Sequence, residues 1–426
     1  MKYLKQIDKP SSFNPNVIVI FATMLLAMFH IGTFMQKYYS FYITCIAAAV
    51  ITMFYFIFNF KHPDIFDAPF LLLCLSAFII IALGMLLKEE SFTEAAGKRL
   101  PYVLWPLLYR FSRNKTDRKL RVFLIVLFSV VLAVSVILTL VTLVNDSSAA
   151  RLLAGKATET ERAEYYAKGV GGYGFVFGTV FIAYALLKFG RTINLKAGKI
   201  AIIVFIALIG IMTVFASYTT AIILFFVLVF VAAFTSAKKH NWVGFVLLFV
   251  GSVLVIVFRN TIFEAFAQLG KTLELPYVEN RFTQLLDASS EGSVEGLRRY
   301  TLYKKSLDTF FSNILTGGTE IGKHSEIFDL MGTYGIFSIP FIVSQVLIFR
   351  QLSKDSAYRA ESVYWIFFAY MFIDTVDSIV TVPMIYFVLP FILAYTDKEK
   401  EKMALPINYK GVRSVYEKSR RNNPLL

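Results

Sequence analysis

The sequence predicts an all-α, polytopic integral membrane protein with about 12 transmembrane helices and one large extracytoplasmic helical loop. Of the 426 residues, 57% are hydrophobic and only 17% are charged, whereas soluble domains contain roughly 25% charged residues. The apolar residues also form continuous runs of about 20, the length that a helix needs to cross a bilayer core. Continuous rather than alternating runs argue against an outer-membrane β-barrel.

Twelve runs are apolar enough to be interpreted as membrane spans. They are 16–35, 39–60, 66–87, 92–111, 122–144, 171–188, 200–216, 218–236, 242–258, 327–349, 362–374 and 379–396. The last two are short and would form a hairpin through Asp374 and Asp377. All must be helical, because a lone strand would leave its backbone polar groups unpaired in lipid.

The distribution of positive charge predicts the orientation of these spans. With the N-terminus inside, most of the 43 Lys and Arg residues fall on the cytoplasmic side, including the short basic connectors 110–121 and 188–199. Both termini are then cytoplasmic, and the net charge of +14 reflects topology rather than nucleic-acid binding. The expected division is spans one to nine over 1–258, the extracytoplasmic loop over 259–326, spans ten to twelve over 327–396 and a basic cytoplasmic tail over 397–426.

The long outer loop is expected to fold into helices at the membrane surface. Apolar residues recur at helical spacing over 262–273, 278–286 and 294–311. The last of these helices carries Arg298 and Arg299. An Arg fork binds two phosphate oxygens at once, so this pair suits a diphosphate. A solvated basic face is the alternative interpretation.

Several further side chains are candidates for a site on the outer side. Arg281 would be a third cation for the diphosphate, or a surface loop arginine. His324 lies where the loop enters the tenth span, close to Glu326, and an imidazole beside a carboxylate can accept a proton near neutral pH. A helix-start histidine without a role is the alternative. Lys98 and Arg99 lie inside the fourth span, where charges usually face a polar cavity, unless they snorkel to the headgroups.

No other catalytic pattern is present in the sequence. It contains no phosphate-binding loop, no dinucleotide fingerprint, no His-Glu-x-x-His and no acidic cluster suited to Mg²⁺ at the outer surface. Cys45 and Cys74 both fall inside predicted spans, which argues against a disulfide framework or a Cys-based metal site. Neither a cofactor nor a metal is therefore expected.

Three blocks in the C-terminal half resemble the O-antigen polymerase and O-antigen ligase superfamily of bacterial membrane proteins. Residues 280–282, Asn-Arg-Phe, are similar to the block at the start of that family's outer loop. Residues 296–303 are similar to its Arg-x-x-x-Trp/Tyr helix, and Arg299 with Tyr303 has that spacing. Residues 317–335 are similar to its Gly-rich turn, followed by a His and a helix ending in Gly.

The sequence departs from the family pattern at one position. Family members often carry an arginine where this chain has Tyr218. Another cation, such as Lys98 or Arg99, would then take its place, or the donor is held differently.

The resemblance implies a glycosyltransferase of the bacterial cytoplasmic membrane that acts at the outer face. Its donor would be an undecaprenyl-diphosphate-linked oligosaccharide, whose anomeric carbon is attacked by an acceptor sugar hydroxyl with inversion and without a metal. Arg298, Arg299 and Arg281 would stabilise the leaving diphosphate, assisted by Lys98 and Arg99. His324 would orient or deprotonate the acceptor hydroxyl. The supporting residues would be Glu326, Tyr303 and Tyr218.

The resemblance favours a polymerase of O-antigen, capsule or exopolysaccharide repeats, because His324-Ser325 and the residues after it look more like polymerases. A ligase that transfers the lipid-linked glycan to lipid A core or another acceptor is the first alternative. A non-enzymatic lipid or solute transporter is the second, although paired broken helices typical of transporters are not evident. Expected partners are membrane lipid, a chain-length regulator and a flippase.

Overall fold

The computed structural model describes residues 16–38, 41–59, 66–113, 118–193, 195–235, 246, 250–251, 253–254, 257–290, 295–323, 325–354, 356, 358 and 378–396. Within these residues every regular element is a helix and there is no strand. The prediction of an all-α protein is therefore confirmed. The run 362–374 and most of the run 242–258 lie outside the described residues.

Five described helical segments are long and apolar enough to cross a membrane, which is compatible with a membrane protein. They are Ala68–Leu87 (α3), Leu120–Asn145 of α5 (Arg118–Asn145), Tyr173–Gly190 (α8), Lys196–Phe215 (α9) and Glu326–Leu352. Shorter apolar helices are α1 (Asn16–Ile31), α2 (Phe41–Asn59), α10 (Thr219–Phe234) and the segment Val380–Leu393. The count of 12 spans and their orientation stay predictions.

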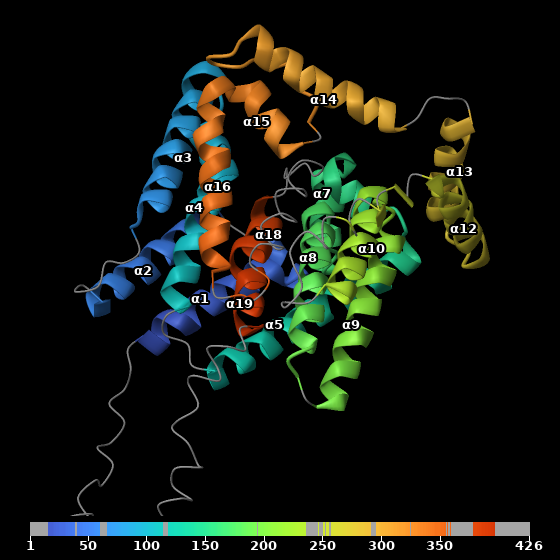
Figure 1. Ribbon diagram of the computed structural model, residues 1–426, viewed down its shortest axis with the longest axis horizontal. Coiled ribbons are helices and arrows are strands. Elements are labelled where there is room, and N and C mark those ends of the chain that lie inside the picture. The colour runs from blue at the N-terminus through green and yellow to red at the C-terminus, as the bar shows by residue number, and fades with distance from the viewer. Residues whose placement is uncertain are drawn as a thin grey trace, which may run out of the picture.

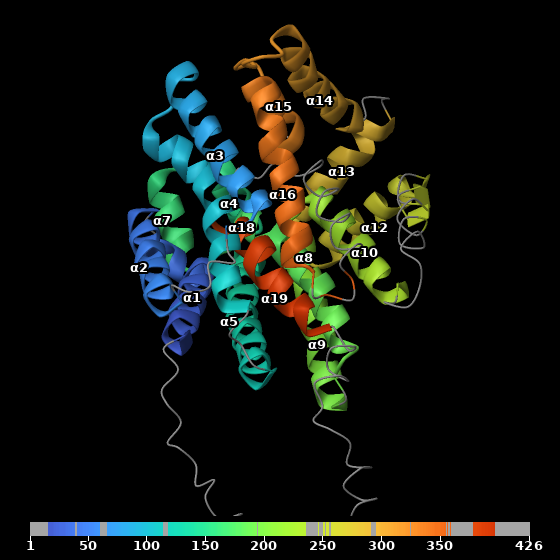
Figure 2. The same cartoon turned by 60° about the vertical axis from the view of Figure 1, so that its left-hand side comes forward.

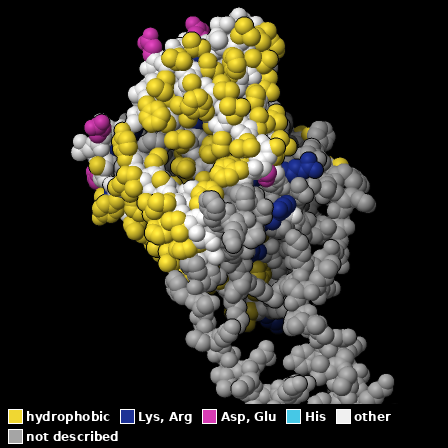
Figure 3. Space-filling view, turned by 90° about the vertical axis from the view of Figure 1, so that its left-hand side faces the viewer, with side chains coloured by type: hydrophobic (Ala, Val, Ile, Leu, Met, Phe, Trp, Pro, Cys, Tyr) yellow, Lys and Arg dark blue, Asp and Glu magenta, His cyan; other side chains and the backbone are white. Residues whose placement is uncertain are grey.

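Helix α8 lies at the centre of the bundle. It packs against α9, α10, α18 (Ser378–Pro383) and α19 (Leu389–Leu393), and in Figures 1 and 2 it lies between α10 and α18. Its side chains from Gly174 to Leu186 are buried. Helix α3, by contrast, exposes Leu71, Leu75 and Phe78. Figure 3 shows hydrophobic side chains over much of the molecule on that side, as expected of a lipid-facing surface.

Local sequence signals explain where several helices begin. Asp67 is the N-cap of α3, where its carboxylate accepts a hydrogen bond from the Phe70 N–H at 3.0 Å. Helix α7 (Glu159–Ala167) begins with a capping box, in which Thr158 and Glu161 each bond the other's backbone N–H.

The predicted tenth span is two helices rather than one. Helix α15 covers Glu326–Tyr334, a 3-10 turn covers Gly335–Phe337, and α16 covers Ser338–Leu352. Gly335 has φ of 58°, and a Cβ at this position would lie 2.3 Å from the Ile314 carbonyl oxygen. That same carbonyl accepts a hydrogen bond from the Ile336 N–H. The break therefore depends on glycine, since a side chain would meet backbone.

The region predicted as the outer loop contains helices in the three expected stretches. They are α12 (Arg259–Thr272), α13 (Pro276–Ser290) and α14 (Glu295–Ser312). Helices α12 and α13 pair through stacked Phe266 and Phe282 rings. Their apolar side packs on Ile222 of α10. Helix α14 packs on α15 instead, and Figure 1 shows this pair at one end of the bundle.

Candidate functional site

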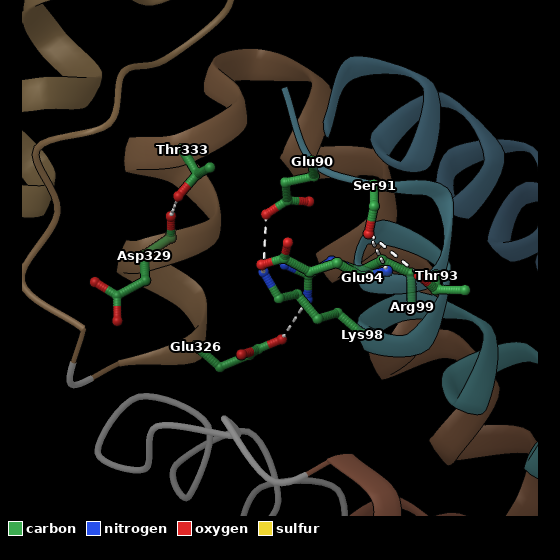
Figure 4. Close-up of polar contacts among 9 residues, drawn as sticks. All are labelled: Glu90, Ser91, Thr93, Glu94, Lys98, Arg99, Glu326, Asp329 and Thr333. Carbon is green, nitrogen blue, oxygen red and sulfur yellow. Dashed lines mark hydrogen bonds and ion pairs between the residues drawn. The ribbon is translucent and has the colours of Figure 1, made fainter. Parts of the chain in front are cut away.

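A polar cavity of about 500 Å³ lies where α4 (Phe92–Arg113) and α15 meet, next to the turn between α3 and α4. Lys98, Arg99 and Glu326, all predicted from the sequence as site residues, line it together. The full lining is Lys88, Glu89, Glu90, Glu94, Lys98, Arg99, Gly318, Thr319, Ile321, Lys323, Glu326, Asp329, Leu330, Thr333 and Tyr334. The Gly-rich block and the basic start of α4 thus contribute to one site, shown in Figure 4.

An ion pair between Arg99 and Glu326 connects the two walls of the cavity. The Arg99 guanidinium donates to Glu326 Oε1 at 3.1 Å, and the Tyr102 hydroxyl donates to the same oxygen at 3.3 Å. The two charged side chains are only 12% and 10% exposed. The guanidinium also lies 5.6 Å from the centre of the Tyr334 ring. This pair therefore connects α15 to α4 through two charged side chains that are largely buried.

Lys98 lies between two carboxylates, one in the turn between α3 and α4 and one on its own helix. Its ammonium donates to Glu90 at 2.8 Å and to Glu94 at 2.9 Å (Figure 4). Glu90 and Glu94 were not predicted as site residues, because acidic side chains near a turn usually form a solvated surface. Each cation of α4 at the cavity is thus paired with at least one carboxylate.

The charges that line the cavity nearly balance. Its Lys and Arg residues are Lys88, Lys98, Arg99 and Lys323, and its acidic residues are Glu89, Glu90, Glu94, Glu326 and Asp329. A wall with one more negative than positive group does not attract an anion. Alternating charged donors and acceptors suit a neutral ligand with many hydroxyl groups, because each hydroxyl can both donate and accept a hydrogen bond.

Asp329 holds the Gly-rich segment between α14 and α15. Its Oδ1 accepts hydrogen bonds from the Ser306 hydroxyl at 2.6 Å and the Lys323 N–H at 3.1 Å. Its Oδ2 accepts one from the Ser325 N–H at 2.9 Å. Ser306 in turn accepts the Gly322 N–H at 2.8 Å. Asp329 was not among the predicted site residues, because its role depends on backbone N–H groups that the fold turns toward it.

The structure describes only some of the remaining residues that were predicted in the loop. His324 lies outside the described residues. Arg298 and Arg299 lie on α14, but their side chains are outside the described part of the chain. The Tyr303 ring of α14 packs 5.6 Å from the Phe328 ring of α15. Arg281 lies on α13, which pairs with α12. Their assigned roles stay predictions.

Tyr218 is buried and belongs to a different part of the molecule. Its hydroxyl donates to the Ala150 carbonyl oxygen at 2.6 Å, and its ring meets the Tyr173 ring edge to face. The cation that lies against Tyr218 is Arg151, whose guanidinium is 5.5 Å from the ring centre. Lys98 and Arg99, the cations suggested for this place, line the cavity instead. Arg151 was missed because a single arginine in a polar connection forms no sequence pattern.

The segment that carries Arg151 is held by Asp146. This carboxylate accepts the hydroxyl groups of Ser148 and Tyr165, both at 2.6 Å. Burial opposes its ionisation, but these hydrogen bonds outweigh burial and hold the pKa of Asp146 below its usual value. The hydrogen bond to this carboxylate raises the pKa of Tyr165 to about 12. At neutral pH the pair is therefore a charged carboxylate and a neutral phenol.

Comparison with known proteins identifies no family. No protein-family model matches the chain, and no curated protein matches it in sequence. Among the described residues, no group of three or more His, Cys, Asp and Glu side chains is arranged to hold a metal ion. A functional hypothesis therefore rests on the sequence resemblance and on the cavity.

Proposed function

We propose that this protein is a membrane glycosyltransferase that joins undecaprenyl-diphosphate-linked oligosaccharide repeats into a polysaccharide. The class of product is O-antigen, capsule or exopolysaccharide, made at the outer face of the bacterial cytoplasmic membrane. One observation carries the proposal: residues from the Gly-rich block that resembles the polymerases line a polar cavity together with the charged start of α4.

The chemistry of the cavity suits the sugar part of such a substrate. Its volume of about 500 Å³ falls within the range of about 300–1,000 Å³ that is typical of ligand sites. Because Lys98 and Arg99 are paired with carboxylates, we assign them to hydrogen bonds with sugar hydroxyls rather than to the diphosphate. Glu90, Glu94 and Glu326 would accept hydrogen bonds from the same hydroxyls.

The leaving diphosphate needs positive charge that carboxylates do not neutralise. In this proposal Arg298, Arg299 and Arg281 supply that charge, and His324 orients or deprotonates the attacking hydroxyl. The bond between the anomeric carbon and the diphosphate oxygen breaks as the new glycosidic bond forms. The acceptor proton leaves through His324, and the lipid diphosphate is the second product.

A matched pair of lysine variants tests the assignment of the cavity. Lys98→Gln removes a cation from the lining, whereas Lys168→Gln removes one from a similarly exposed ion pair, with Glu164 on α7. The proposal predicts that a deletion strain carrying the Lys98 variant makes much shorter polysaccharide on gels, at unchanged membrane level of the protein. The Lys168 variant should restore the full length distribution. Equal restoration by both variants would exclude this cavity as the sugar site.

A further inference from the structure

Arg151 has an environment unlike that of the cations at the cavity. It is the last residue of the short helix α6 (Ala149–Arg151). Its guanidinium lies 5.5 Å from the ring centre of Tyr218 and 5.9 Å from that of Tyr277 on α13. One of its nitrogens, Nη2, donates to the Ser217 carbonyl oxygen at 2.7 Å. Three parts of the chain thus position one positive charge.

This positive charge is not neutralised within the described residues. There, Arg151 forms no ion pair with a carboxylate, and its Nε is buried without a hydrogen-bond partner. By contrast, Lys98, Arg99 and Arg110 each pair with an acidic side chain, although the Arg99 Nε is also buried without a hydrogen-bond partner among the described residues. A buried N–H that lacks an acceptor is costly. An anion with several oxygens would supply the missing acceptor and the missing charge together.

The start of α10 adds further donors at the same place. Tyr218 is the N-cap of this 16-residue helix, and its side chain makes no capping hydrogen bond. The Thr219 hydroxyl in the first turn is buried and has no partner among the described residues. The first N–H groups of a helix lack intrahelical acceptors and carry partial positive charge. Arg151 bonds the Ser217 carbonyl just after the end of α9, where a cation is favourable, and it also adds positive charge beside the start of α10, which favours an anion there.

The backbone before α10 brings these groups together. Ser217 has φ of 57°, in the left-handed region that residues other than glycine rarely adopt. This conformation ends α9, starts α10 two residues later and leaves the Ser217 carbonyl bonded to Arg151. Strained backbone of this kind often marks a functional position.

We propose that Arg151, Thr219 and the first turn of α10 bind a phosphate group carried by a lipid. A lipid is favoured because α10 is apolar and exposes Phe226 and Phe230 along its length, a surface suited to an acyl or prenyl chain. If α10 crosses the membrane, its start lies at the depth of headgroup phosphates. The phosphate site rests on the contacts alone, whereas its assignment to the lipid diphosphate donor rests on the proposed function, in which Arg151 would add to the charge assigned to Arg281, Arg298 and Arg299.

Binding of defined lipids to the full-length protein in neutral detergent tests this inference. The probes are farnesyl diphosphate, phosphatidylglycerol and, as a phosphate-free control, diacylglycerol, and their binding is measured by native mass spectrometry and by the shift in melting temperature. Arg151→Gln is expected to weaken binding of the phosphate-bearing probes by about tenfold or more. Arg162→Gln, on the exposed side of α7, should leave binding unchanged.

The outcomes separate the two sources of the phosphate. Preference for farnesyl diphosphate assigns the site to a lipid diphosphate, and equal binding of phosphatidylglycerol assigns it to a phospholipid headgroup. Unchanged binding by Arg151→Gln overturns the proposal. If that variant does not fold, Thr219→Val decides, since it removes only the hydroxyl, and unchanged binding again overturns it. The two proposals can also fail separately. If lipid binding depends on Arg151 but deletion of the gene leaves the surface glycan unaltered, this site is retained and the polymerase function is rejected.

Discussion

Replacing Arg99 by Gln is expected to weaken the attachment of α15 to α4. The charges of Arg99 and Glu326 are 3.1 Å apart, so at an effective dielectric constant of about 20 they attract by about 5 kcal/mol. Part of this energy offsets the lost hydration of the two groups. Removing one partner of such a buried pair then costs about 3 kcal/mol, since it leaves the other charge unpaired.

A double-mutant cycle measures this coupling. The free energy of unfolding of Arg99→Gln, Glu326→Gln and the double variant is determined in mixed micelles, with SDS as the denaturant and circular dichroism as the signal. The double variant should lose about 2 kcal/mol less than the sum of the single variants. Lys168→Gln is the control, because its pair with Glu164 is 50% and 60% exposed and should contribute below about 1 kcal/mol. Additive effects of Arg99→Gln and Glu326→Gln would refute this account of the contact.

Three further predictions concern the segments that support the two sites. The pKa of Asp146 is depressed in the folded protein, so its hydrogen bonds stabilise the fold above the usual carboxyl pKa and are lost as the pH falls through the lower folded value. Tyr165→Phe removes one of these bonds and should therefore reduce the fall in unfolding midpoint between about pH 5 and 3. A fall as large as that of the wild-type protein contradicts this. Gly322→Ala should prevent stable packing of α14 on α15, because the added Cβ would lie 2.1 Å from the Leu302 carbonyl oxygen. Limited proteolysis of the variant should therefore be faster than that of the wild-type protein, and equal rates would refute this prediction. Ser306→Ala removes hydrogen bonds to Asp329 and Gly322 and should cost about 1–3 kcal/mol in the same unfolding assay, whereas no change would show that these bonds are dispensable.

Periodicity located the helices of the region predicted as the outer loop well. The stretches predicted as 262–273, 278–286 and 294–311 are occupied by α12, α13 and α14, with ends that differ by a few residues. Apolar side chains at helical spacing reflect burial on one side of a helix, and that burial is local enough to be visible in sequence. The resemblance implied a helix ending at Gly335, where α15 does end. Hydropathy did not show this break, because both sides of it are apolar and the turn depends on a contact with Ile314.

The cavity was predictable only in part. The position of Lys98 and Arg99 inside an apolar run indicated a polar environment, and they do line one. Their partners were not predictable, because the contact of Arg99 with Glu326 joins residues 227 positions apart. Asp329 was missed because its role depends on backbone N–H groups that the fold turns toward it.

The site at Arg151 shows the limit of sequence reasoning more clearly. The sequence indicated that Tyr218 departs from the family pattern and that another cation could compensate. It offered no means of choosing among the arginines of the chain. In the structure Arg151 is the cation that lies against Tyr218, through a contact between α6 and the start of α10 that spacing along the chain does not determine.

The most direct test of the proposed function is the length distribution of surface glycan in a strain from which the gene is deleted, with the lipid extract analysed alongside. The polymerase proposal predicts surface glycan reduced to single repeats, with single repeats accumulating on undecaprenyl diphosphate. Long polymer retained on the lipid carrier would contradict it in favour of a ligase. An unaltered distribution of both glycan and lipid-linked repeats would contradict glycan transfer altogether.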